Sequence, residues 1–278
     1  MIREKLLLSL LTLLLPHQVA FEVPLGILLR RALLVVEAEV LTDTRSLPVP
    51  PSRTLTRVRI LRIWKGKCGA KEIDVLGLDH HAAHYRAGES VLLTLGPLPP
   101  DIEGTTPPAH AALQGKREKL LLTPENREAI LEFVRRYLAL PEGQGAAISE
   151  RKDLLVETLS TPIAVLRKDA FLELMQLPRL DRLLSRQDVP RLLPIIGNEA
   201  FPPLERIALL AAIAPHLRRG EIAALAATAK EANVREALVE VQAFYFPPPP
   251  QEGRVPRGES LTSPPDGGDH ASQTKAAP

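Results

Sequence analysis

The chain is poor in the residue types on which many functional classes depend. It has one cysteine in 278 residues, which excludes an intramolecular disulfide and any zinc or iron–sulfur site built from several thiolates. Aromatic residues make up only 4%, which argues against a platform that stacks bases or sugars. The formal net charge is +2, so no overall field draws in nucleic acid or an anionic membrane.

Catalytic signatures are also scarce. The sequence contains no Gly-x-Ser-x-Gly, no phosphate-binding glycine loop with its lysine and no dinucleotide fingerprint, so we expect no cofactor. Cys68 follows two nearby lysines, a basic setting that can activate a thiol. No base can be assigned to it, however, so we interpret it as an incidental thiol and expect a protein that is not an enzyme.

The N-terminus has the pattern of a secretory signal. Arg3 and Lys5 precede an apolar run at 6–15, and residues 16–20 turn polar. This is the order of regions in a signal peptide. As a helix the run would be about 15 Å long, half of a bilayer core, so we expect no membrane-spanning segment. We predict a signal peptide at 1–20 and an exported protein, periplasmic or extracellular; a buried amphipathic helix is the alternative.

Strand patterns dominate the part of the chain that follows. We predict a short helix at 23–31 and strands at 32–41, 54–64, 71–76, 89–95 and 116–122. Glu37 and Glu39 alternate with apolar residues, which favours a sheet with one solvated face over a catalytic pair of carboxylates. The apolar phase changes between Ile60 and Leu61. This predicts a β-bulge at which the buried side of the strand changes, as in small barrels.

From Thr123 onward the apolar period changes from two to 3.6, the period of helices. Thr123 and Pro124 suit the cap and first position of a helix, and Ser149 suits the cap of the next. We expect further helices at 161–177, 187–196, 203–213, 221–230 and 233–244. The breaks between them are short, which favours antiparallel neighbours.

Three of these helices share a weak repeat. Its copies, at 166–172, 204–210 and 233–239, each have a basic residue, a spacer, an alanine and two large apolar residues. A shared alanine lets stacked helices approach closely. The alternative is coincidence in a region rich in alanine and leucine.

The tail at 247–278 has eight prolines and almost no large apolar side chain. Such a segment cannot bury enough surface to offset its ordering entropy, so we predict disorder. A polyproline segment at 247–250 that docks in an aromatic groove is the sharper alternative.

Three stretches carry a family likeness: LVVEAEV at 34–40, VRILRIWKG at 58–66 and YRAGESVLL at 85–93. In this order they resemble the core of netrin-like, TIMP-like domains of exported bacterial proteins, which implies a five-stranded OB-like barrel. Relatives that inhibit metalloproteases use an N-terminal cysteine and a disulfide frame, and this chain has neither. Protease inhibition is therefore not implied. The helical half resembles HEAT-like repeats.

The predicted fold class is α+β with two domains. A five-stranded antiparallel OB-like β-barrel occupies 21–122, and an α-helical repeat-like domain occupies 123–246.

One histidine cluster offers candidate metal ligands. His80, His81 and His84 follow Asp79, and on a helix His80 and His84 would share a face that suits Zn²⁺, Ni²⁺ or Cu²⁺. The segment lies between two predicted strands and lacks the glutamate of a His-Glu-x-x-His motif. A solvated loop is therefore the favoured interpretation.

A basic strip on one strand, Arg57, Arg59 and Arg62, has only Trp64 as a nearby large aromatic, so we expect no binding of nucleic acid. We predict an exported, non-catalytic binding or scaffolding protein of the cell envelope, with another envelope or extracellular protein as its partner. The alternative is a metal-binding protein or metal-dependent enzyme that uses the histidine loop.

Overall fold

The structure, a computed structural model, describes residues 23–47, 53–77, 83–98, 109–112, 119–143 and 145–247. The predicted signal peptide, His80, His81 and the tail beyond Pro247 lie outside these residues. Contacts group the chain up to Phe246 into one compact unit. Within the described part, no helix has the length and apolar character needed to cross a membrane.

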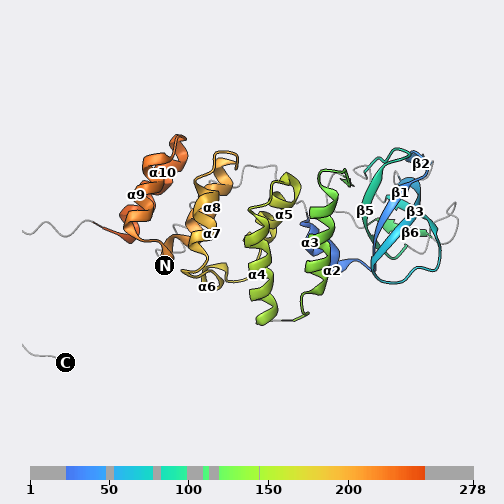
Figure 1. The fold of residues 1–278 in the computed structure, drawn as a ribbon, viewed down its shortest axis with the longest axis horizontal. Coiled ribbons are helices and arrows are strands. Elements are labelled where there is room, and N and C mark those ends of the chain that lie inside the picture. The colour runs from blue at the N-terminus through green and yellow to red at the C-terminus, as the bar shows by residue number, and fades with distance from the viewer. Residues whose placement is uncertain are drawn as a thin grey trace, which may run out of the picture. The chain divides into compact units, whose positions relative to one another are not determined.

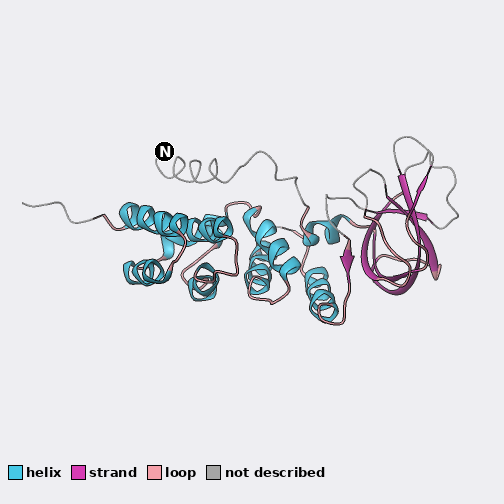
Figure 2. Ribbon diagram, turned by 90° about the horizontal axis from the view of Figure 1, so that it is seen from above, coloured by secondary structure: helices cyan, strands magenta, loops and turns pink. Residues whose placement is uncertain are grey.

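Five strands close into a barrel, seen in magenta in Figure 2. The strands are β1 (Leu34–Val40), β2 (Arg45–Leu47), β3 (Arg53–Lys65), β4 (Glu72–Gly77), β5 (Ser90–Gly96), β6 (Ala109–Ala112) and β7 (Leu120–Leu121). The order β1-β3-β4-β6-β5 returns to β1 through the β1–β5 pairing. The two remaining strands lie outside this ring: β2 pairs with β3, and β7 pairs with β5. The α+β fold class with an OB-like barrel is thus confirmed.

The barrel is mixed rather than purely antiparallel. Among the described strands every pair is antiparallel except β4 and β6, which run in parallel with Asp74 opposite Ala109. A closed ring with an odd number of strands cannot alternate direction all the way round. A five-stranded closed barrel therefore needs at least one parallel pair, and the prediction of an antiparallel barrel was wrong for that reason.

The predicted bulge in the long strand is confirmed. In the β1–β3 register Ala38 faces Ile60 and Glu37 faces Arg62, so Leu61 is the extra residue, and a second shift skips Trp64. The buried side does not change, however, because Leu61 and Ile63 are exposed. The bulges shift the pairing of β3 with β1 but do not move these apolar residues into the core.

The fifth barrel strand was assigned to the wrong residues. The fifth strand of the barrel is β6. Within the predicted strand at 116–122 only Leu120 and Leu121 form a strand, β7, which pairs with the first half of β5. The sequence of β6, Ala-His-Ala-Ala, contains no β-branched or aromatic residue. Its strand signal was therefore too weak to detect.

The remaining elements are helical. They are α2 (Leu25–Arg31), α3 (Arg127–Ala139), α4 (Ala146–Thr158), α5 (Ala164–Met175), α6 (Leu180–Leu183), α7 (Val189–Ile196), α8 (Pro203–Ile213), the 3₁₀ turn η1 (Ala214–His216), α9 (Arg219–Thr228) and α10 (Ala232–Tyr245). Two predicted starts were wrong. Thr123 begins a turn in which its N–H donates to Asn126 Oδ1 at 2.8 Å, so α3 starts later, and α4 starts before Ser149.

The helices pack against near neighbours in the sequence, as Figure 1 shows for α4 with α5 and α9 with α10. The exception is α2, which precedes the barrel yet packs against α3 and α5. Three apolar clusters result: the barrel interior, the junction of α2 and α3 with the barrel, and the helices from α4 to α10. Leu29 and Val35 are buried in the second cluster, which joins the two halves.

Candidate functional site

The predicted metal and thiol residues do not form a site in the described residues. His84 is exposed before β5, and His80 and His81 lie outside the part that the structure describes. Cys68 is half-buried, with Sγ 3.7 Å from the carbonyl oxygen of Ala70. Within the described ranges no three histidine, cysteine or acidic side chains gather in a way that could hold a metal ion.

Glu37 and Glu39 do not share a solvated face as predicted. Glu37 is 2% exposed and accepts hydrogen bonds from Nε and Nη2 of Arg127 at 2.9 and 2.6 Å. Glu39 is half-buried and pairs with Arg59 at 3.1 Å. The prediction for Glu37 was wrong because Arg127, in the first turn of α3, pairs with this carboxylate. A contact between such distant residues is not revealed by the alternation in β1.

The basic strip on β3 is largely neutralised by neighbouring strands. Arg57 lies 3.3 Å from Asp74 on β4, and Arg59 pairs with Glu39 on β1 and, at 3.8 Å, with Glu72 on β4. Arg62 instead stacks over Trp64, with its guanidinium carbon 4.0 Å from the ring centroid. These contacts leave Arg62 as the member of the strip without a carboxylate partner among the described residues.

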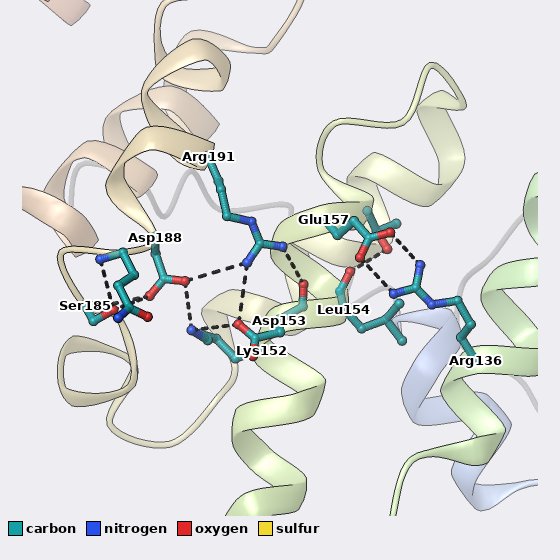
Figure 3. Close-up of polar contacts among 10 residues, drawn as sticks. Arg136, Lys152, Asp153, Leu154, Glu157, Ser185, Asp188 and Arg191 are labelled. Carbon is teal, nitrogen blue, oxygen red and sulfur yellow. Dashed lines mark hydrogen bonds and ion pairs between the residues drawn. The ribbon is translucent and has the colours of Figure 1, made fainter.

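A hollow of about 320 Å³ opens between α3 and α4. Its lining residues are Arg135, Arg136, Ala139, Leu140, Glu150, Asp153, Leu154 and Glu157. The arginines come from α3 and the carboxylates from α4, so the two walls carry opposite charges. Arg136 and Glu157 join the walls through two parallel hydrogen bonds of 2.5 and 2.8 Å (Figure 3). This bidentate pair links the two walls of the hollow.

An ionic cluster that shares Asp153 with the hollow joins α4 to α7 (Figure 3). Lys152 Nζ lies 2.8 Å from Asp188 Oδ1 and 2.9 Å from Asp153 Oδ1, and Arg191 lies 3.5 Å from Asp153. Burial opposes the charge of Lys152, but the hydrogen bonds to Asp188 and Asp153 outweigh burial and raise its pKa. Burial likewise raises the pKa of Asp188, but the bonds from Lys152 and Ser185 lower it further than burial raises it.

A second buried cluster joins α2 to α3 and α5. Tyr137 donates to Glu173 Oε1, and Arg30 donates to Tyr137 Oη at 3.1 Å and to Glu173 Oε1 at 3.5 Å. Burial raises the pKa of both Tyr137 and Glu173. Glu173 Oε2 is buried without a hydrogen-bond partner in the described part of the chain. Gly26 is the residue of α2 beside this carboxyl and the Tyr137 ring.

None of these helical groups was singled out from the sequence. Arg136 and Glu157 are 21 residues apart, and Lys152 and Asp188 are 36 apart. Only the packing of the helices brings them together, so their spacing carries no motif. Comparison with known proteins adds no assignment, because no family model matches the chain and no curated protein matches it.

Proposed function

We propose that this chain is a non-catalytic binding or scaffolding protein that is exported and serves the cell envelope, with another envelope or extracellular protein as its partner. The observation that carries the proposal is the charged hollow between α3 and α4. Its volume is within the range of sites that hold a small group or a few side chains. Opposed charged walls and an apolar lining suit a protein segment that carries both an ionic and an apolar side chain.

The fixed geometry of the hollow supports this proposal. Arg136 is tied to Glu157, and Asp153 is tied to Lys152 and Arg191. Side chains already ordered before binding lose less conformational entropy when a partner arrives. The layout of a closed barrel followed by helices also fits the resemblance to netrin-like and HEAT-like modules, both of which present surfaces to partners.

A photocrosslinking amino acid at position 139 tests the proposal in the native host. Ala139 is exposed and lines the hollow, and Ala227 on α9, also an exposed alanine near a helix end, is the matched control. We expect a discrete adduct from position 139 that is absent from position 227 and lost on Arg136→Glu, which disrupts the ionic wall. The same adducts at both positions, or no effect of the charge reversal, would contradict the proposal.

Export is tested on its own by cell fractionation and intact-mass measurement. We expect an envelope or extracellular product that lacks residues 1–20. A cytoplasmic product that keeps them would contradict export.

The metal-binding alternative predicts a different result in calorimetry. We expect the heats of Zn²⁺ titration to be equal for the wild type and for His80→Ala/His84→Ala. A saturable heat that the double substitution abolishes would favour the alternative.

A further inference from the structure

The end of β3 has a strand partner on one side only. β3 pairs with β1 up to Lys65, but its register with β4 stops at Arg59. One more hydrogen bond follows, from Ile60 N to Lys71 O at 2.8 Å. Within the described residues, the segment 61–65 therefore has one edge without a neighbouring strand. We call this segment the β3 tip.

The side chains of the β3 tip are unusual for a sheet edge. Leu61 is 53% exposed and Ile63 is 37% exposed, although both are large and apolar. In the register with β1, Ile63 lies opposite Val36 and Arg62 lies opposite Glu37, so these two side chains are on opposite faces, and Leu61 is the bulged residue beside them. A strand added to this edge would therefore meet apolar groups on one face and a cation on the other.

The chain segment that contains the β3 tip carries charge of one sign only. Residues 54–71 contain six lysines and arginines and no aspartate or glutamate. Arg57 and Arg59 reach carboxylates on other strands, and Lys65 donates to the carbonyl oxygens of Leu29 and Arg30 at 3.0 and 2.7 Å. Three exposed cations, Arg62, Lys67 and Lys71, have no carboxylate partner in the described parts of the chain. Among the described residues these three cations are therefore available to pair with a partner.

Exposed edges with apolar side chains are normally protected, because they pair with other chains. The open edge is short, because Ile60 still bonds to Lys71 and β3 ends at Lys65, which favours a short partner over open-ended aggregation. An edge of this kind offers unpaired backbone groups for main-chain hydrogen bonds, and the alternate side chains set the choice of partner.

We propose that the β3 tip binds an extended acidic segment of a partner protein by strand addition. Apolar residues of that segment lie beside Leu61 and Ile63, and its alternate carboxylates face Arg62, with Lys67 and Lys71 nearby. The inference rests on the proposed binding function but places this contact on the barrel, on a different surface from the hollow between α3 and α4.

Fluorescence anisotropy of the full chain with short labelled peptides tests this. The probe is a peptide of alternating valine and glutamate, compared with a valine–lysine peptide and with the acidic peptide N-methylated at alternate residues on its hydrogen-bonding edge. We expect both comparison peptides to bind at least about tenfold more weakly than the probe. Equal binding of the N-methylated peptide would overturn strand addition, and equal or tighter binding of oligo-dT would assign the surface to nucleic acid instead.

Paired charge reversals locate the site. Arg62→Glu with Lys67→Glu should weaken binding of the acidic peptide at least about tenfold. The matched control, Arg219→Glu with Arg235→Glu, reverses two exposed charges on α9 and α10 and should leave binding unchanged. Equal effects of the two pairs would overturn the assignment. Arg136→Glu separates the two proposals, because it should abolish crosslinking in the hollow but not peptide binding.

Discussion

The barrel and the helical half handle charge in different ways. In the barrel, ion pairs join neighbouring strands at the surface, as where Arg59 meets Glu39 and Glu72 with all three side chains partly exposed. In the helical half, Lys152 and Asp188 pair inside, with side chains 8% and 3% exposed. Lys152 and Asp188 thus form a pair in which both members are buried between helices, whereas each strand-to-strand pair described in the barrel keeps at least one member near water.

The difference follows from where each kind of element places its backbone hydrogen bonds. In a sheet these bonds join neighbours, so the ladder itself specifies which strand lies beside which. In a helix they stay within one element, so side chains must specify the neighbour. Arg206, which is 1% exposed, is such a side chain. Its Nε donates to Ile196 O at 2.6 Å, and its Nη1 lies 2.7 Å from the carboxylate of Glu231. One side chain thus links α8 to the end of α7 and the start of α10.

The largest effect that would test this contrast comes from Asp188→Ala. The substitution leaves the buried ammonium of Lys152 with Asp153 as its remaining carboxylate and frees the N–H of Ser185, so we expect a loss of about 3 kcal/mol in the free energy of unfolding. Urea denaturation followed by circular dichroism measures it. The matched control is Glu132→Ala, which breaks an exposed pair with Arg135 on α3 and should change nothing measurable.

The double variant Asp188→Leu with Lys152→Met tests whether the buried pair contributes stability or only specifies the contact between helices. If the pair serves mainly to specify how α4 meets α7, replacing both ions by apolar groups should recover most of the stability lost in Asp188→Ala. A double variant as unstable as the single one would contradict this interpretation.

The next effect is steric, at the cluster that ties α2 to the helices. A Cβ added at Gly26 would overlap Glu173 Oε2 and the Tyr137 ring, both of them buried. We expect Gly26→Ala to lower the free energy of unfolding by about 2 kcal/mol, as overpacking in a core does. Gly220→Ala on α9 is the control, since its Cβ would meet nothing within 4 Å, and it should be neutral or stabilising by about 0.5 kcal/mol. Similar losses at both glycines would contradict the steric argument.

A smaller effect depends on pH. Burial raises the pKa of Glu173 despite the hydrogen bond from Tyr137, so the folded protein holds this proton better than the unfolded chain does. The associated stabilisation is complete below the unfolded pKa, about 4.3, and is lost as pH rises through the folded value. Glu173→Gln cannot lose a proton. We therefore expect the wild type to lose stability relative to this variant as pH rises above about 4.3, measured as urea midpoints, and parallel curves would contradict the assignment.

The stability contribution of Asp188 depends on pH in the opposite direction. Its pKa is lowered in the folded protein, so its stabilisation is present above the unfolded pKa and is lost as pH falls through the folded value. Glu173 therefore limits the stability of the helical half as pH rises, and Asp188 limits it as pH falls.

The same contrast explains how much of the fold could be predicted from the sequence. Periodicity located most strands and helices to within a few residues and placed the bulge at Leu61, because both signals are local. It failed at β6, whose pairing with β4 and β5 depends on distant strands, and at Thr123, where a turn competes with the helix start.

The hollow and the buried pairs could not have been predicted from the sequence, because they form only when distant helices pack together. Glu157 is an ordinary surface glutamate in the sequence, and only the packing of α3 on α4 brings it to Arg136. The β3 tip is intermediate. Its basic run and its phase change were visible in the sequence, but its open edge depends on where β4 ends.

The smallest expected effect is in the barrel, where an exposed ion pair can be compared with the buried pair of the helical half. Arg59→Ala removes a cation from between Glu39 and Glu72, but these side chains are 40% to 50% exposed and water replaces the lost partner. We expect a loss of less than about 1 kcal/mol in the free energy of unfolding, and a smaller loss still in high salt, because ions screen exposed pairs. A double-mutant cycle of Arg59→Ala with Glu72→Ala should give a coupling energy well below that of Lys152 with Asp188. A coupling as large as the buried one would mean that the barrel also depends on specific ion pairs to set its strand order.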